Sequence, residues 1–314
     1  MLFSFNLYKE TIIKRLQECL NDVEVEIVKN IKNNGVEVMG LYLHSKTVAI
    51  SPIINIEDTE GIYDVDDVEA FVERALAVFE HAAEKNRKDV SVLKNWQTIS
   101  SIIRPKVVNY EKNKEQLERE MPFVKILDLA VIFVIPSKEI FPEYGEGIIR
   151  VNNNMMKDWN VTKQCLYQNA MANLKKEKYD FKNLLEYLSD IFLGNQANGN
   201  EEPTLNMLTC FNGIDGAVVL VCKKFLTEVC EKLNRRTVYI LPSSIHEVLV
   251  LDVKEFEVEK LKKMVKEVNK EILDPKEFLS DNVYKFDSVT CELKIVGVTE
   301  YADENRCVVV GDIA

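Results

Sequence analysis

The sequence predicts an α+β protein in which an antiparallel N-terminal α-β-β-β-α unit precedes a larger mixed sheet covered by helices. Residues 4–20 carry apolar side chains at helical spacing. Residues 23–28 then alternate between apolar and charged side chains, which is the period of a half-buried strand. Farther along, 127–135 is the most continuous apolar run, and its β-branched side chains indicate a strand that is buried on both faces.

The N-terminal unit is predicted to turn at residues 33–35. This Asn-Asn-Gly sequence tolerates the positive φ angles that a tight turn requires. Return strands are expected over 36–43 and 46–51, which gives an antiparallel meander over 23–51. The next helix begins with acidic residues at 64–67 and has an apolar stripe at helical spacing, formed by Val68, Phe71, Val72, Ala75 and Phe79.

The remainder of the chain is expected to continue with strands and helices. Apolar periodicity and turn residues predict helices over 90–101, 111–120, 160–175, 216–233 and 255–272, and strands over 106–110, 127–135, 145–152, 205–211, 238–241, 245–251, 283–286, 289–296 and 307–310. Residues 194–203 are rich in turn formers and are predicted to be a surface loop or a linker. The chain is interpreted either as two lobes, 1–100 and 101–314, or as one continuous domain.

The composition is that of a soluble globular protein. The 314 residues are 46% hydrophobic and 29% charged, and no apolar run approaches the roughly 20 residues that cross a bilayer. The N-terminus shows neither a basic segment nor a small-residue cleavage site, so no signal peptide is expected. We therefore expect a cytoplasmic protein that does not bind membranes.

The net charge and the cysteines disfavour two further classes of protein, namely nucleic-acid-binding proteins and proteins with a zinc or thioredoxin-type cysteine pair. A formal net charge of −11 disfavours sequence-independent nucleic-acid binding, which depends on basic side chains that neutralise phosphates. The seven cysteines are odd in number, and none forms a C-x-x-C pair of the zinc or thioredoxin type. Most of them lie in apolar runs, so we expect buried thiols that act as small hydrophobic side chains.

One stretch carries the candidate chemistry. Between two apolar runs stands Pro242-Ser243-Ser244, followed by His246-Glu247. In a strand, Ser244 and His246 would share one face, while Ser243 and Glu247 would share the other. A hydrolase would use Ser244 and His246 as nucleophile and base, and a third catalytic group would have to come from elsewhere. The alternative is a strand-entry turn, in which Pro242 fixes φ and the serine hydroxyls bond nearby backbone.

The histidines and carboxylates predict no metal site. A zincin helix that started at His246 would need its second histidine at position 250, where Val250 stands. His44 and His81 have no neighbouring ligands in the sequence. The acidic residues over 57–67 do not have the spacing of a calcium-binding loop, so a solvated acidic loop is expected.

Two segments match phosphate-binding motifs only in part. The segment 145–150 begins with Gly-x-Gly but has arginine where a dinucleotide fingerprint has its third glycine. The segment 213–216 opens a predicted helix, and a helix N-terminus can hold an anion. Asp215, however, is expected to cap that helix, and its charge would repel phosphate. We therefore predict no cofactor.

Four stretches resemble one bacterial family without an assigned activity. They are Val107-Val-Asn-Tyr-Glu-Lys-Asn-Lys with Leu127-Asp-Leu-Ala-Val, Asn152-Asn-Asn with Trp159, Gly216-Ala with Leu241-Pro-Ser-Ser-Ile-His-Glu-Val, and Leu279-Ser-Asp-Asn-Val-Tyr-Lys-Phe-Asp. Together with Ser51-Pro52 and the helix after it, they are similar to the Domain of Unknown Function family five-six-eight-eight of Gram-positive anaerobes. The resemblance implies a soluble cytoplasmic protein and supplies no catalytic residues.

The expected function is that of a non-enzymatic protein that binds a partner protein or a small molecule. Its polar binding surface is predicted at Pro242, Ser243, Ser244, His246 and Glu247. The alternative hypothesis is a hydrolase-like enzyme that uses Ser244 and His246, with Glu247 as a further candidate.

Overall fold

The fold is described from a computed structural model of the chain. The structure describes residues 3–45, 53–56, 63–85, 90–142, 147–184, 204–242, 244–252 and 258–297. The described α-helices are α1 (Phe5–Cys19), α2 (Val65–Lys85), α3 (Trp96–Ile102), α4 (Tyr110–Glu120), α5 (Ser137–Ile140), α6 (Asn153–Asp158), α7 (Lys163–Leu174), α9 (Lys223–Lys232) and α10 (Val258–Ile272). Short 3₁₀ helices are η1 (Asn33–Gly35), η2 (Val90–Lys94), η4 (Phe211–Gly213) and η5 (Gly216–Val221).

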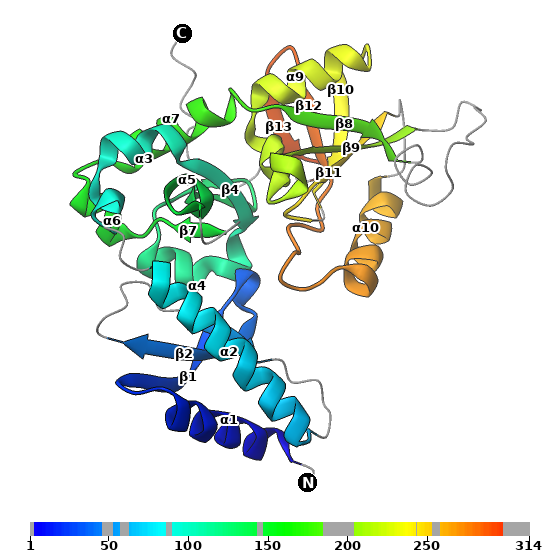
Figure 1. The fold of residues 1–314 in the computed structure, drawn as a ribbon. Helices are drawn as coiled ribbons and strands as arrows, with labels where there is room; N and C mark the ends of the chain where they lie inside the picture. Colours follow the sequence, from blue (N-terminus) through cyan, green and yellow to red (C-terminus); the bar gives the residue numbers. More distant parts are fainter. Residues whose placement is uncertain are drawn as a thin grey trace.

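The described strands belong to three sheets. They are β1 (Val23–Ile31), β2 (Glu37–Ser45), β3 (Ile53–Ile56), β4 (Arg104–Asn109), β5 (Phe123–Ile126), β6 (Leu129–Pro136), β7 (Ile148–Arg150), β8 (Tyr179–Asn183), β9 (Thr204–Cys210), β10 (Thr237–Leu241), β11 (Val248–Asp252), β12 (Tyr284–Asp287) and β13 (Glu292–Ile295). Helices pack against each sheet, which confirms the predicted α+β class (Figure 1).

The N-terminal unit has the predicted order α1-β1-β2-β3-α2. Its three strands form an antiparallel sheet, and α1 and α2 share one core with it (Figure 1). Asn34 and Gly35 adopt φ angles of 61° and 70° in the turn between β1 and β2, as the sequence predicts. The third strand is Ile53–Ile56. The strand predicted over 46–51 lies outside the described residues.

The middle sheet is built around β6, every residue of which is buried, as predicted for a strand covered on both faces. Val134 of β6 pairs with Arg104 of β4 on one side and with Arg150 of β7 on the other. Strands β5 and β7 therefore both pair with the side of β6 that lies opposite β4. Helix α4 covers one face of this sheet, and α3 and α7 cover the other.

The C-terminal sheet has six strands in the order β13-β12-β10-β11-β9-β8. Its largest core lies against η5 and α9 and also takes in Val107, Leu129 and Val131 of the middle sheet. Helix α10 packs on the opposite face through Val265, against Leu241. Other apolar side chains of α10 are exposed, namely Met264, Val268 and Ile272.

The mixed sheet expected after residue 100 is replaced by two separate sheets, in which all described pairs are antiparallel. The connections explain the difference. Residues 127–128 join β5 to β6, and residues 242–247 join β10 to β11. Parallel neighbours require a crossover of a dozen or more residues, so connections this short can join only antiparallel neighbours.

The helix predicted over 216–233 is divided at Cys222 into η5 and α9. The start of η5 lies very close to β9 and β11. A Cβ atom on Gly216 would stand 2.0 Å from Thr209 Oγ1 and 2.5 Å from the Cys210 carbonyl oxygen. Close packing of the backbone thus sets the tighter helical turn, and periodicity alone could not reveal it.

Further expectations from the sequence concern the division into lobes, a strand near the end of the chain and membrane-spanning helices. Helix α3 crosses residue 100 and packs with the middle sheet, and the division into lobes 1–100 and 101–314 stays a prediction. The strand predicted over 307–310 lies outside the described residues. None of the helices in the described ranges is both long and apolar enough to cross a membrane.

Candidate functional site

The stretch predicted as the site connects β10 to β11 and packs against the segment that follows α10. The carbonyl of Pro242 accepts a hydrogen bond from the Ser280 amide at 2.9 Å. Ser244 forms an isolated antiparallel bridge with Phe278. Ser243 lies outside the described residues. The stretch is therefore part of a junction between two segments of the C-terminal region rather than a free loop.

Ser244 is 3% exposed, and its hydroxyl is used by its own turn. The oxygen accepts the backbone N–H of His246 at 2.9 Å, and the hydroxyl also hydrogen-bonds to the Glu247 carboxylate. Among the described side chains, no hydrogen bond joins the Ser244 hydroxyl to the His246 ring. The arrangement has the local bonding of a serine turn, in which a hydroxyl bonds the backbone two residues ahead.

His246 lies between two distant segments. Its Nδ1 accepts the backbone N–H of Asp215 at 3.2 Å, and its Nε2 is 3.8 Å from Oε1 of Glu277. Because Nδ1 is an acceptor, the neutral ring carries its proton on Nε2, which faces the carboxylate. The His246 carbonyl in turn accepts the Thr209 hydroxyl at 2.7 Å. The ring is held by its neighbours and is only partly exposed.

Glu247 has the most perturbed carboxyl group of the stretch. Burial raises its pKa, and the nearby negative charge of Glu277 raises it further. The hydrogen bond from Ser244 and the charge of His246 act in the opposite direction. The Glu247 and Glu277 carboxyl groups thus lie close enough for their charges to interact.

Asp215 does not cap η5, contrary to expectation. Its backbone is left-handed, with φ of 55°, and its side chain makes no capping hydrogen bond. The carboxylate instead accepts from Lys106 Nζ at 2.6 Å, and both side chains are nearly buried, at 13% and 10% exposure. This ion pair ties the loop before η5 to β4, and it connects the predicted stretch to the middle sheet through the bond from Asp215 to His246.

A second polar cluster joins the middle sheet to the C-terminal sheet. The Asp128 carboxylate accepts hydrogen bonds from Ser280 Oγ at 2.6 Å, from Asn282 Nδ2 at 2.9 Å, and from the Tyr284 hydroxyl. Asn109 Nδ2 donates to the Leu279 carbonyl at 2.9 Å. Burial raises the pKa of Tyr284 well above its ordinary value. These residues come from the stretches that carry the family resemblance.

Asparagines extend this network to the N-terminal unit. Asn34 Nδ2 donates to the carbonyls of Pro275 and Phe278, at 2.8 Å and 2.7 Å. Asn34 also exchanges hydrogen bonds with Asn113 of α4. The sequence pattern did not predict this junction, because the partners of Asn34 lie 79 to 244 residues away along the chain.

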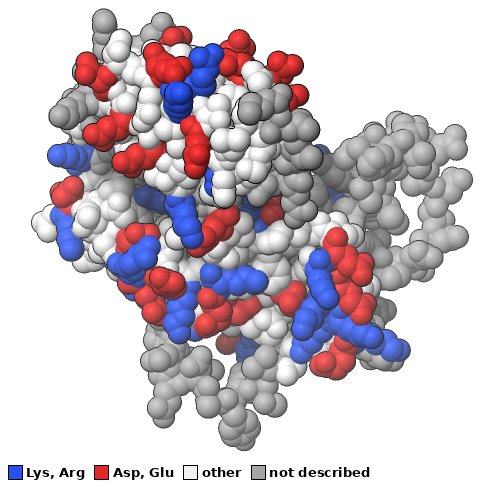
Figure 2. All heavy atoms as spheres, turned by 90° about the horizontal axis from the view of Figure 1, so that it is seen from below, with Lys and Arg blue, Asp and Glu red and all other residues white. Residues whose placement is uncertain are grey.

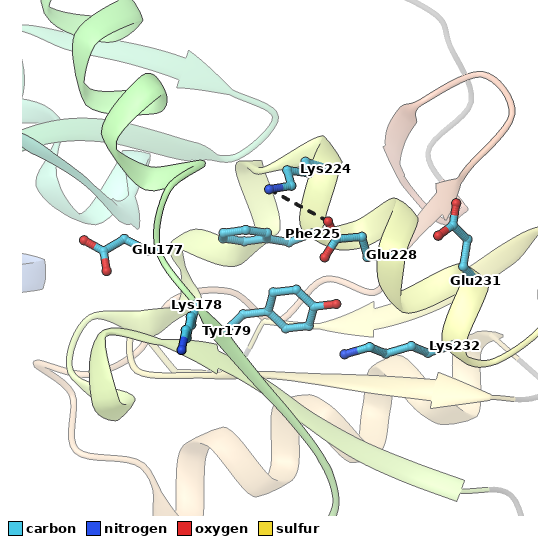
Figure 3. Close-up of a pocket in the computed structure, with 8 residues that line it drawn as sticks. All are labelled: Glu177, Lys178, Tyr179, Lys224, Phe225, Glu228, Glu231 and Lys232. Carbon is cyan, nitrogen blue, oxygen red and sulfur yellow. Dashed lines mark ion pairs between the residues drawn. The ribbon is translucent and has the colours of Figure 1, made fainter.

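An open groove of about 490 Å³ lies between the start of β8 and α9 (Figure 3). The Tyr179 and Phe225 rings meet there at 5.0 Å between centroids and 45° between planes. Three basic and three acidic residues complete the lining, namely Lys178, Lys224, Lys232, Glu177, Glu228 and Glu231. The sequence did not indicate this groove, because mixed lysines and glutamates are typical of a solvated surface.

The Tyr179 hydroxyl is the unusual atom of the groove. It is buried, and within the described part of the chain no group meets it at hydrogen-bonding geometry. Burial raises the pKa of Tyr179; the Lys232 ammonium beside the hydroxyl lowers it and the Glu228 carboxylate raises it, and both side chains lie within reach of a hydrogen bond after a small movement. Lys232 Nζ lies 4.5 Å from the centre of the tyrosine ring, and Figure 3 shows it extending alongside that ring.

Neither charge segregation on the face drawn in Figure 2 nor a metal-binding cluster marks a site among the described residues. On that face, acidic and basic side chains are interspersed rather than gathered by sign. No group of three or more His, Cys, Asp or Glu residues in the described ranges is arranged to hold a metal ion. His44 instead hydrogen-bonds through Nδ1 to the Tyr42 hydroxyl at 3.2 Å.

The fold and these contacts define an α+β protein with antiparallel sheets, held together by a polar junction. The chain belongs to the Family of unknown function (DUF5688), whose model matches residues 5–288. A search of curated proteins and a search of solved structures each found no match.

Proposed function

We propose that the protein is a non-enzymatic binding protein that holds a short peptide in the groove between β8 and α9. The buried Tyr179 hydroxyl without a hydrogen-bond partner carries this proposal. A buried polar group normally has a partner, because leaving it unsatisfied costs about 1–3 kcal/mol. A ligand group that displaces the neighbouring Lys232 or Glu228 side chain can bond this hydroxyl and supply the missing partner.

The chemistry of the groove fits a peptide. Its volume of about 490 Å³ is in the range of small-molecule sites. The Tyr179 and Phe225 rings offer apolar surface, and a peptide amide can bond the hydroxyl as donor or acceptor. Lysines and glutamates occur together around the rings, and they match the opposite charges of the two peptide termini.

The contacts of Ser244 favour binding over hydrolysis. A nucleophilic serine needs its hydroxyl at hydrogen-bonding distance from the base, whereas the Ser244 hydroxyl bonds the His246 backbone and is nearly buried. A fluorophosphonate probe is therefore expected to leave Ser244 unlabelled. Labelling that is lost in His246→Ala, with the fold intact, would establish the hydrolase alternative instead.

Peptide binding is tested with pooled tripeptides by saturation-transfer NMR, followed by calorimetric titration of the best-bound sequence. We expect Tyr179→Phe to weaken binding about fivefold, because it removes one hydrogen bond worth about 1 kcal/mol. The apo variant should be no less stable than the parent, since the hydroxyl has no partner to lose.

Tyr239→Phe is the matched control, because Tyr239 lies on β10 of the same sheet and does not line the groove. It should leave tripeptide affinity unchanged. Absence of any bound tripeptide, or equal affinity in Tyr179→Phe, would refute the proposed function.

The location and the sequence-predicted surface belong to the same proposal. The family resemblance supports a bacterial, cytoplasmic protein. The stretch Pro242–Glu247 stays a prediction as a binding surface, and its partly exposed members, His246 and Glu247, are where a second contact with a partner would form.

A further inference from the structure

A narrow crevice lies where the N-terminal unit meets the middle sheet. The turn η1 rests there on α4 and β4, and the crevice has room for about 10 Å³, the size of one oxygen-centred group. It is lined by Asn33, Lys106, Val108, Asn113, Gln116, Leu117, Met121, Ile132 and Arg150. None of these residues lines the groove beside β8.

The sheet register places two cationic side chains in this crevice. Lys106 pairs with Ile132, and Arg150 pairs with Val134 two residues farther along β6. Cross-strand partners lie on the same face of a sheet, as do alternate residues of one strand. Lys106 and Arg150 therefore share the face that α4 covers, next to its apolar contacts.

Arg150 is held there without a counter-charge of its own. Within the described ranges no hydrogen bond or ion pair engages its guanidinium group, while Lys106 is paired with Asp215. Burial lowers the pKa of Arg150, and the more distant charges of Asp215 and Glu120 oppose that effect. A partly buried cation without a partner is costly, and arginine is the side chain best suited to bind an oxyanion.

Lys32 adds a second cation of the same kind. Among the described residues its ammonium group makes no ion pair, and its pKa is lowered by burial and by the positive charges of Arg150 and Lys276. Lys276 is paired with Asp274 at 2.8 Å. Lys32 and Arg150 are thus the two uncompensated cations at this point of a chain whose net charge is −11.

Asn33 supplies an unpaired acceptor in the same crevice. It is 9% exposed, and its Oδ1 is buried without a hydrogen-bond partner among the described residues. Its Nδ2 donates to the Lys276 carbonyl at 2.7 Å, which fixes the orientation of the amide. Exchanging the two amide atoms would place two carbonyl oxygens against each other. The unpaired atom can therefore accept a hydrogen bond from a group that enters the crevice.

We propose that this crevice binds a phosphate group through one protonated oxygen. The P–OH group donates to Asn33 Oδ1 and accepts from Lys106, while the charged oxygens bond Arg150 and, outside the residues that line the crevice, Lys32, whose positive charge interacts with that of Arg150. A carboxylate or sulfate has no proton for Asn33 near neutral pH. The crevice has room for one oxygen, so the remaining three phosphate oxygens lie outside it.

The test is calorimetric titration of the full-length protein at about pH 6, near the second pKa of a phosphate monoester, with inorganic phosphate and, separately, with glycerol 3-phosphate. Tighter binding of one of them identifies a free phosphate or a phosphate ester as the ligand. Arg150→Gln and Lys32→Gln should each weaken binding about tenfold, because each removes a charge-assisted hydrogen bond. Arg119→Gln and Lys29→Gln, which change exposed cations outside the crevice, should bind as the parent does.

Two further results decide the assignment. Sulfate should bind at least about tenfold more weakly than phosphate, because it leaves the Asn33 acceptor unsatisfied. Equal affinity for sulfate, or no saturable binding of either phosphate compound, would overturn the proposal. Arg150→Gln should also melt no lower than the parent in phosphate-free buffer. If that variant fails to fold, Lys32→Gln decides, and unchanged phosphate affinity in it would overturn the site.

Discussion

At the scale of single residues, the surroundings of Ser244, His246 and Glu247 determine whether their side chains can act in catalysis. Ser, His and Glu side chains occur together at Ser244, His246 and Glu247, and their proximity in sequence suggested a catalytic set. The Ser244 hydroxyl instead bonds the His246 backbone and the Glu247 carboxylate, and the His246 ring bonds the Asp215 backbone. The chemical character of these residues was visible in the sequence, whereas their partners, which come from other elements, were not.

Glu247 provides a test at this scale. Burial raises its pKa in the folded protein, so ionisation of its carboxyl group opposes folding. Its contribution to stability is present below the unfolded pKa and is lost as pH rises through the folded pKa. We expect Glu247→Gln to remove this loss, so that the variant gains stability relative to the parent as pH rises above the ordinary glutamate pKa.

Urea unfolding of parent and variant between pH 4 and pH 7 measures that difference. Glu115→Gln is the control, since the Glu115 side chain is 92% exposed and should change nothing. A stability difference between Glu247→Gln and the parent that does not vary with pH would contradict the assignment.

At the scale of helices and strands, the sequence pattern predicted the elements that are determined by interactions between neighbouring residues. The order α1-β1-β2-β3-α2 was predicted because each element has its own periodicity and the turn at Asn33–Gly35 has its own chemistry. Strand β5 was missed, because four half-buried residues are too few to show a period. The separation of the later strands into two sheets depends on pairing across the chain, which no window of sequence contains.

The short helix η5, which precedes α9, also depends on contacts with distant residues. Its closest contact, at Gly216, can be tested by mutation. Gly216 is expected to be required for the close contact with β9, so Gly216→Ala should destabilise the protein by about 3 kcal/mol. Gly147→Ala is the comparison, because its nearest contact would be the Ser137 hydroxyl at 3.0 Å, which can give way. Chemical denaturation measures both, and equal stability of the two variants would show that the approach at Gly216 is not tight.

For the whole molecule, the segment after α10 is the point where all three sheets are connected. It receives hydrogen bonds from Asn34 of the N-terminal turn and from Asn109 of the middle sheet, and it donates to Asp128. The matching family model covers residues 5–288 and so includes all of these residues. The motifs that carried the resemblance thus maintain the arrangement of the sheets.

Asp128→Asn tests the importance of this junction. The amide is nearly isosteric, but it places a donor against three groups that now donate to the carboxylate. We expect a loss of about 2–3 kcal/mol in the free energy of unfolding, in a transition that stays cooperative. Asp158→Asn, at an exposed position, should have no effect. Unchanged stability of Asp128→Asn would mean that the junction contributes little.

The proposal that the protein binds a peptide beside β8 is tested most directly by hydrogen–deuterium exchange with and without the best-bound tripeptide. The proposal predicts slower exchange confined to residues 177–179 and 224–232, which line the groove. Slower exchange over 242–247 with none at the groove would contradict it and would place binding on the stretch that the sequence singled out.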